Sequence, residues 1–283
     1  MMRIKRARPG EVLRRNCSQN IEYLTFPILE ETEIVDHLFS TRIGGASEGI
    51  FRSMNLSYTR GDKKEAVDEN FRRIAGVLGR EVEDFVCSDQ THTTNIRKVT
   101  EKDRGKGVLS EKDYAEIDGL ITDEPGLVLS TFYADCVPLY FVDPVHRAIG
   151  LSHSGWRGTV SRMGVCTLSA MKEEYGTKAE DVIVAIGPSI CGECYEVSED
   201  VVLEFQREFK DVNLEFLYEK GEGKYLLDLW KANYRILIEG GVLPEHISVT
   251  DICTCCNPDY LFSHRASLGK RGNLGAFMSL RNA

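Results

Sequence analysis

The sequence predicts an α+β fold in which mixed β-sheets carry helices on their outer faces. Short apolar segments with strand character recur along all 283 residues, and amphipathic helical segments separate only some of them. Such a mixture, without a regular βαβ rhythm, favours an α+β sandwich over a doubly wound fold. No internal repeat or Pro/Gly-rich linker divides the chain. We therefore expect one domain over residues 21–283, preceded by a basic arm over residues 1–20.

The predicted elements of the first half follow the hydrophobic pattern. A strand opens near residue 37 and runs into a Gly/Ser-rich loop that ends near residue 57. Residues 63–78 predict a helix that ends at Gly79. Its apolar face consists of Val67, Phe71, Ile74, Ala75 and Leu78. Residues 84–100 predict short β-structure with a polar centre, residues 118–144 predict two strands around the turn DEPG, and residues 148–155 predict another strand.

The second half continues with alternating types. Residues 159–175 predict a helix that Gly176 closes, and residues 181–188 predict a buried strand. A helix follows Ser198 as N-cap, and a second amphipathic helix ends at Gly240. Residues 247–254 predict a strand, and residues 260–280 predict a loop between two final short strands.

Composition and charge narrow the function classes. The hydrophobic content of 42% and the charged content of 28% are those of an ordinary globular protein. A net charge of −9 argues against nonspecific nucleic-acid binding. The basic start MMRIKRARPGEVLRR lacks the apolar core of a signal peptide, and no segment approaches the roughly 20 apolar residues that span a bilayer. Nine irregularly spaced cysteines indicate reduced thiols, so we expect a cytoplasmic protein.

Four polar residues in or beside predicted strands are the candidates for chemistry: His92, Asp135, Cys136 and His153. Cys136 and His153 belong to consecutive strands joined by the short turn DPVHR, so they are expected to be neighbours in one sheet. His, Cys and His form a suitable ligand set for Zn²⁺, with a fourth position left for water or substrate. The same residues also suit a Cys–His nucleophilic pair with a second histidine.

Other motifs are weaker candidates. Cys191 and Cys194 have CxxC spacing, but we do not pair them with a second CxxC and interpret them as local packing. The cysteines at 253, 255 and 256 are too crowded for one tetrahedral site without distant partners. The segment TRIGGASEG lacks the pattern of a P-loop, yet Arg42 and its glycine amides suit an anion.

Six blocks of sequence resemble a known family. FSTRIGGASEGIFRSMNLS, SDQTHTTNI, DGLITDEPGLVLSTFYADCVPLYFVDP, IGLSHSGWRGTV, AIGPSICGECYEV and CTCCNPDYLFSHR recur in this order. They resemble the YfiH/laccase-domain family, also called the multicopper polyphenol oxidase or purine nucleoside phosphorylase family. The resemblance covers residues 37–280, and the ADCVPL and HSGWRG blocks are its most specific parts.

The resemblance implies a fold, a metal site and an activity. The fold is an αββα sandwich related to the catalytic domain of cytotoxic necrotizing factor, and the metal ligands are His92, Cys136 and His153. The activities are phosphorolysis of adenosine, inosine and methylthioadenosine, and deamination of adenosine. The expected partners are thus purine nucleosides and phosphate, with zinc as cofactor and copper as a substitute in vitro. The protein is expected to be a monomer or weak homo-oligomer that binds neither nucleic acid nor membrane.

Within that interpretation, Arg42 and then Arg265 are the expected phosphate-binding residues. Asp135 is expected to act as a general base or to orient the Cys136 ligand. Thr93 stands where the family pattern has glycine. The later Thr-Gly-Arg of the family is replaced within ASLGKRGNLG.

Three alternatives stay open. A copper polyphenol oxidase is disfavoured because the chain has six histidines and no His-x-His pair. A metal-free amidase or hydrolase acting on peptidoglycan precursors would use Cys136 and His153 directly. A non-enzymatic partner of cell-division or envelope proteins would be consistent with the acidic charge.

Overall fold

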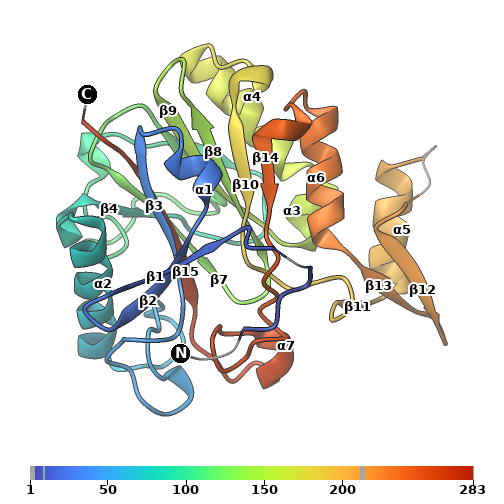
Figure 1. Ribbon diagram of the computed structural model, residues 1–283, viewed down its shortest axis with the longest axis horizontal. Coiled ribbons are helices and arrows are strands. Elements are labelled where there is room, and N and C mark those ends of the chain that lie inside the picture. Colours follow the sequence, from blue (N-terminus) through green and yellow to red (C-terminus); the bar gives the residue numbers. More distant parts are fainter. Residues whose placement is uncertain (1–3, 9, 211–213, 283) are drawn as a thin grey trace.

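The computed structural model describes residues 4–8, 10–210 and 214–282 (Figure 1). Its helices are α1 (Pro27–Glu30), α2 (Lys64–Leu78), α3 (Trp156–Val160), α4 (Met163–Tyr175), α5 (Glu199–Glu208), α6 (Leu229–Glu239) and α7 (His264–Ser267). Its strands are β1 (Arg14–Ser18), β2 (Ile21–Thr25), β3 (Val35–Ser40), β4 (Phe85–Cys87), β5 (Ile96–Lys98), β6 (Gly119–Thr122), β7 (Val128–Tyr133), β8 (Val137–Asp143), β9 (Ala148–Ser154), β10 (Ile183–Ile186), β11 (Glu196–Ser198), β12 (Leu217–Gly221), β13 (Lys224–Leu227), β14 (Ile247–Val249) and β15 (Leu274–Leu280).

Two six-stranded mixed sheets form the centre of the molecule. The first has the order β1-β2-β3-β15-β7-β4, and the second has the order β14-β10-β8-β9-β6-β5. Helix α2 covers the outer face of the first sheet, and α4 and α6 cover the second (Figure 1). The predicted α+β sandwich with αββα layering is therefore confirmed.

The main core lies between the two sheets. Leu129 and Tyr133 of β7 meet Tyr140 of β8 and Leu151 of β9 there, and all four side chains are at most 1% exposed. The outer clusters pair each sheet with its helices. Phe71 of α2 packs edge to face on Phe85, which in turn packs on Phe277 of the same sheet. Because these strands are packed on both faces, they hold the polar residues at their ends in fixed positions.

The predicted helical faces are confirmed. Val67, Phe71, Ile74, Ala75 and Leu78 are all buried along α2. Gly79 ends this helix with φ 63°, in the left-handed region that glycine adopts at little cost. The single helix expected over residues 159–175 was wrong, because the chain forms two helices, α3 and α4, separated by Arg162 with φ 59°. Helix α4 ends at Gly176 with φ 77°, as predicted, and α6 is followed by Gly240.

The segment of residues 118–144 forms three strands, and the expectation of two was wrong. Strand β7 belongs to the first sheet and β8 to the second, so residues 134–136 connect the two sheets. Asp135 has φ 95°, which no strand residue adopts. Asp135 and Cys136 therefore lie at a break between strands, where their side chains are free of the ladder.

The end of the chain also differs from expectation. Residues 260–262 form no strand, whereas β15 spans Leu274–Leu280 and lies between β3 and β7 in the middle of the first sheet. All residues of β15 are buried, so it lacks the alternation of apolar and polar residues that marks a half-buried strand, and its length was underestimated. None of the helices in the described ranges is long and apolar enough to cross a membrane.

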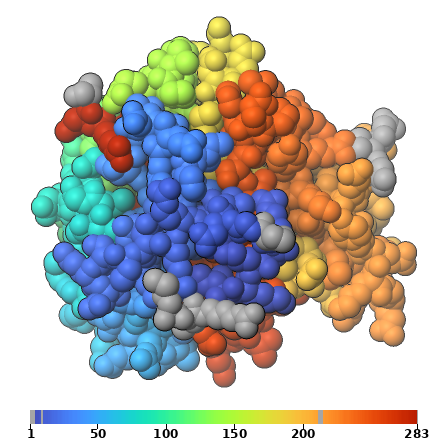
Figure 2. Space-filling view, viewed as in Figure 1, coloured from blue at the N-terminus to red at the C-terminus, as the bar shows by residue number. Residues whose placement is uncertain are grey.

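The N-terminal segment packs on the body of the protein. Residues 14–18 form β1, which pairs with β2. Further upstream, Arg6 forms an isolated antiparallel β-bridge with Ile252, which directly precedes Cys253. Figure 2 shows this dark-blue segment lying across the front of the molecule, while β12, β13 and α5 project to one side. The division at residue 20 stays a prediction, but the chain on both sides of it belongs to the same sheet.

Candidate metal and catalytic site

The predicted trio comes together from three parts of the fold. His92 lies in the loop between β4 and β5, Cys136 directly precedes β8, and His153 lies near the end of β9. One ligand atom from each residue lies within 4.8 Å of the others. The Cys136 Sγ atom is 3.9 Å from His92 Nε2, and the two imidazole rings meet edge to face with centroids 4.9 Å apart. The antiparallel pairing of β8 with β9 places Pro138 opposite His153, as the short turn between them predicts.

Asp118, which sequence reasoning missed, organises the site. Its fully buried carboxylate accepts hydrogen bonds from His153 Nδ1 at 2.7 Å and from the backbone N–H groups of Thr91, His92 and Thr93. Burial raises the pKa of Asp118, but the contacts with His153 and these N–H groups outweigh it and lower the pKa to about 2. The ionised carboxylate therefore fixes the His92 loop and the His153 ring together, as residues behind metal-binding histidines do.

The Asp118 contact also fixes the tautomer of His153. Because Nδ1 faces a carboxylate oxygen, the ring proton lies on Nδ1 in the neutral form. The Nε2 lone pair is then directed to the opposite side of the ring, where it can coordinate a metal ion. The feature of the sequence that could have identified Asp118 is its position directly before the buried strand GLIT.

The backbone leaves room for the three ligands at two special positions. His92 adopts φ 69°, which turns its side chain out of the loop toward Cys136. A Cβ atom on Gly155 would lie 2.9 Å from His92 Cδ2 and 3.1 Å from Cys136 Sγ. Glycine is therefore required at 155 for the close approach of the two ligands.

The charges of the site favour a thiolate. Burial raises the pKa of Cys136, but His153 and His92 outweigh this effect and lower it to about 6. Burial lowers the pKa of His153, but Cys136 and Asp118 raise it to about 9. A thiolate beside imidazoles is the form that binds a soft metal ion and also the form that acts as a nucleophile.

The site opens into a cavity of about 370 Å³. His153 is 3% exposed at its base, Cys136 is partly exposed, and His92 is exposed at the rim. Aromatic side chains of Tyr58 and Phe132 line another part of the same cavity. The cavity is therefore large enough to receive a planar heterocycle next to the trio.

Asp135 has a different environment from the one expected. Its Oδ1 atom accepts a hydrogen bond from the Thr254 hydroxyl at 2.6 Å, and its Oδ2 atom accepts one from the backbone N–H of Arg265 at 2.7 Å. Asp135 does not line the cavity described above, although its neighbours Ala134 and Cys136 do. This arrangement favours the orienting role over the general base, and both remain predictions.

The two arginines expected to bind phosphate are engaged elsewhere. Arg42 donates to the backbone carbonyls of Arg52 and Pro258. The Arg265 guanidinium donates to the carbonyl of Glu196 at 2.8 Å. Neither residue lines the cavity of the trio. Their role in phosphate binding therefore stays an untested prediction.

Two other arginines do line the cavity, Arg60 and Arg271. Arg271 is 9% exposed, and its Nε atom has no hydrogen-bond partner among the described residues. Burial and the nearby charge of Arg60 lower the pKa of Arg271 to about 10. Two guanidinium groups facing one cavity, one of them incompletely bonded, are suited to an anion. Arg271 belongs to the segment ASLGKRGNLG, where the resemblance to the family pattern breaks, and this hid it in the sequence.

Thr93 does not enter the cavity. Its hydroxyl lies 3.0 Å from both Asp118 Oδ2 and the Glu116 carbonyl oxygen, and its single proton can be donated to either acceptor. The side chain that replaces the family glycine can therefore add a further donor to the Asp118 carboxylate.

The donor set fits a single metal ion. Two imidazole nitrogens and a thiolate sulfur match the ligand preferences of zinc and copper, and Asp118 supplies the carboxylate that commonly supports a metal-binding histidine. The three residues would leave one position open toward the cavity.

The fold and the sequence are similar to those of known proteins. The family described as multi-copper polyphenol oxidoreductase laccase matches residues 36–281. The "Purine nucleoside phosphorylase YlmD" of Bacillus subtilis is 36% identical over 87% of this chain and 88% of its own length. The crystal structure of YlmD from Geobacillus stearothermophilus has a TM-score of 0.88 at 34% identity, and that of YfiH from Bacillus licheniformis has 0.86 at 32%. Both cover 96% of this chain and 100% of the solved chain. This chain therefore belongs to the YfiH/YlmD family, whose description is multi-copper polyphenol oxidoreductase laccase.

Proposed function

We propose that this protein is a purine nucleoside phosphorylase that uses zinc held by His92, Cys136 and His153. One observation carries the proposal: the trio and the two arginines Arg60 and Arg271 line the same cavity. Relatives named purine nucleoside phosphorylase support the reaction class.

The arginines account for the phosphate. Phosphorolysis needs a phosphate oxygen to form a bond with C1′ of the ribose while the bond from C1′ to the purine nitrogen breaks. Two guanidinium groups neutralise the phosphate and hold it close to the reacting carbon, which converts an encounter of two solutes into a reaction within one site.

The trio and its support account for the nucleoside side of the site. A zinc ion bound there would supply a positive charge that polarises a substrate atom bound at the open position. Asp118 keeps the Nε2 atom of His153 directed at that position, and Cys136 is present as a thiolate at neutral pH. Tyr58 and Phe132 offer aromatic surface on which a purine can stack.

The test is product analysis with adenosine, inosine or methylthioadenosine in the presence and absence of phosphate. We expect free base and ribose 1-phosphate only when phosphate is present, and their loss in Cys136→Ala. Formation of inosine from adenosine without phosphate would demonstrate the second proposed activity, deamination. Turnover that persists in Cys136→Ala after the metal is lost would refute the zinc proposal.

A second candidate is favoured by the low pKa of Cys136. Cys136, His153 and Asp118 form a chain of thiolate, imidazole and carboxylate that also suits a metal-free hydrolase. Hydrolysis of amide substrates by metal-free protein, abolished by iodoacetamide, would favour this candidate over the phosphorylase.

A copper oxidase is a weaker candidate. Among the described residues, the trio is the one group of possible metal ligands that contains histidine. Such a group offers a single-ion site, whereas multicopper oxidation needs several copper ions. Oxidation of phenols that depends on added copper, with no nucleoside turnover, would favour the copper oxidase over the phosphorylase.

A further inference from the structure

Four cysteines from distant parts of the sequence meet beyond the C-terminal ends of β10 and β14. Cys191 and Cys194 follow β10, and Cys253 and Cys256 follow β14. Strands β10 and β14 pair in parallel, so their C-terminal ends reach the same edge of the sheet. A bridge from Ser189 to Cys253 continues this pairing beyond the strands. The Sγ atoms of the four cysteines all lie within 4.8 Å of one another.

The spacing within the sequence is that of a metal-binding motif. Cys191-Gly-Glu-Cys194 and Cys253-Thr-Cys-Cys256 are two CxxC pairs. The interpretation of the first pair as mere packing was incomplete, because its partner is the second pair, 62 residues away along the chain. Paired CxxC motifs of this kind are typical of tetrahedral zinc sites.

The geometry suits one ion. Zinc–sulfur bonds of about 2.3 Å place the sulfur atoms of a tetrahedral site about 3.8 Å apart. The Sγ atoms of Cys194 and Cys256 are 3.4 Å apart, and the other pairs fall within the 4.8 Å limit. All four thiols are free.

The backbone around Cys253 supplies hydrogen bonds suited to a thiolate ligand. The N–H groups of Cys191 and Cys256 both point at Cys253 Sγ, at 3.2 and 3.4 Å. Hydrogen bonds from N–H groups stabilise a negatively charged sulfur more than a neutral thiol. Cys191 and Cys253 are 7% and 2% exposed, so this charge needs compensation close by.

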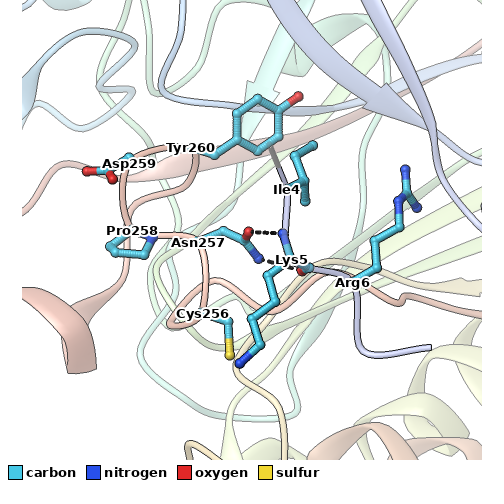
Figure 3. Close-up of a pocket in the computed structure, with 8 residues that line it drawn as sticks. All are labelled: Ile4, Lys5, Arg6, Cys256, Asn257, Pro258, Asp259 and Tyr260. Carbon is cyan, nitrogen blue, oxygen red and sulfur yellow. Dashed lines mark hydrogen bonds between the residues drawn. The ribbon is translucent and has the colours of Figure 1, made fainter. Parts of the chain in front are cut away.

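The basic N-terminal segment lies next to the four thiols. The Lys5 main chain exchanges two hydrogen bonds with the Asn257 side chain, which directly follows Cys256 (Figure 3). Lys5, Arg6 and Arg8 line a cavity together with Cys191, Cys253 and Cys256. A divalent ion with four thiolates carries a net charge of about −2, which this basic segment complements.

We propose that Cys191, Cys194, Cys253 and Cys256 form a second metal site that binds Zn²⁺ as a tetrathiolate. Its role is structural, because four protein ligands leave no position for substrate. The ion joins the two CxxC segments, and these segments hold the Asp135 connection. Thr254 donates to the Asp135 carboxylate at 2.6 Å, and the Ile190 N–H donates to the Asp135 carbonyl at 3.0 Å.

The first test is metal content after purification without chelators and without added metal. We expect about two zinc ions per chain in the unaltered protein and about one in His92→Ala/Cys136→Ala, which lacks only the trio site. Cys194→Ser/Cys256→Ser should also retain about one ion. Cys17→Ser/Cys166→Ser is the matched control, because these thiols are outside both groups, and should retain both ions.

If the cysteine variants fail to fold, His92→Ala/Cys136→Ala still tests the proposal, because it retains all four cysteines of the second site. In that variant, cobalt substitution should give the intense visible bands and sulfur-to-metal charge transfer of a tetrahedral thiolate site. A trio variant that is folded but metal-free and gives no such bands would overturn the proposal. A thiol count in denaturant and chelator, without reductant, adds an independent outcome: nine reactive thiols support the metal site, and fewer would indicate disulfides instead. None of these measurements depends on nucleoside turnover.

Discussion

Replacement of Asp118 by asparagine tests whether the Asp118 carboxylate holds His153 and the His92 loop in place for metal binding. The Asp118 carboxylate accepts from His153 Nδ1 and His92 N–H on Oδ1, and from the Thr91 and Thr93 N–H groups on Oδ2. An asparagine side chain has one acceptor oxygen and one NH₂ group. In either orientation, the NH₂ group opposes groups that donate in the native protein.

The size of the effect follows from these contacts. With NH₂ on the Oδ1 side, His153 must move its proton to Nε2, which removes the lone pair that would bind the metal. With NH₂ on the Oδ2 side, the N–H groups of Thr91 and Thr93 lose their acceptor, and each of these hydrogen bonds to a charged group is worth about 1.5–3 kcal/mol. We therefore expect Asp118→Asn to lower the zinc affinity of the trio by about 10- to 100-fold.

The assay is competition for zinc against a chelator of known affinity, in a background that lacks the four-cysteine site or with that site saturated. Asp143→Asn is the matched control. Asp143 is also fully buried, accepts from His146 Nδ1 at 2.8 Å and from two backbone N–H groups, and lies away from the trio. It should reduce stability without changing zinc affinity. An Asp118→Asn protein that is folded and binds zinc as tightly as the control would refute the role assigned to Asp118.

Three further predictions concern the cavity, the approach of the ligands and the pH dependence of stability. Arg60→Gln should raise the KM for phosphate about tenfold or more while leaving nucleoside binding unchanged, since a charge-assisted contact is worth about 1.5–3 kcal/mol; an unchanged phosphate KM would contradict it. Gly155→Ala should lower zinc affinity because the added Cβ lies 2.9 Å from His92 and 3.1 Å from Cys136, and a titration equal to that of the unaltered protein would show that the loop yields freely. His37, buried and accepting from a backbone N–H, has its pKa lowered to about 3 by burial and by a nearby arginine. Its contribution to stability is complete above about pH 6.5 and is lost as the pH falls toward 3, at about 1.4 kcal/mol per pH unit; chemical denaturation should show a shallower acid decline in His37→Gln, and identical slopes would exclude this effect.

The sequence was sufficient for the parts of the structure that depend on local pattern. The apolar face of α2 and its end at Gly79 follow from periodicity and from the ease with which glycine adopts a positive φ. The neighbourhood of Cys136 and His153 follows from a short turn between consecutive strands. These predictions succeed because the interactions that decide them lie within a few residues of one another.

The sequence was insufficient where partners are distant and the environment decides the role. Asp118 was missed because a carboxylate before a strand acquires its meaning only when three N–H groups of the His92 loop close around it. Arg271 was missed because its importance depends on burial next to Arg60 rather than on a motif. Arg42 was chosen instead because glycine-rich sequence near an arginine suggests an anion site, yet its guanidinium is bonded to backbone carbonyls.

Asp135 occupies the connection between the two sheets. Its positive φ turns the chain from one sheet into the other and places Cys136 at the cavity. Such a conformation is costly for a residue with a side chain and persists only when its surroundings hold it. Thr254, from the second CxxC segment, and the Arg265 N–H supply that hold. In the proposed site, metal bound by the four thiolates would fix Thr254. Thr254 holds the Asp135 carboxylate, and the positive φ of Asp135 sets the direction in which Cys136 leaves the connection.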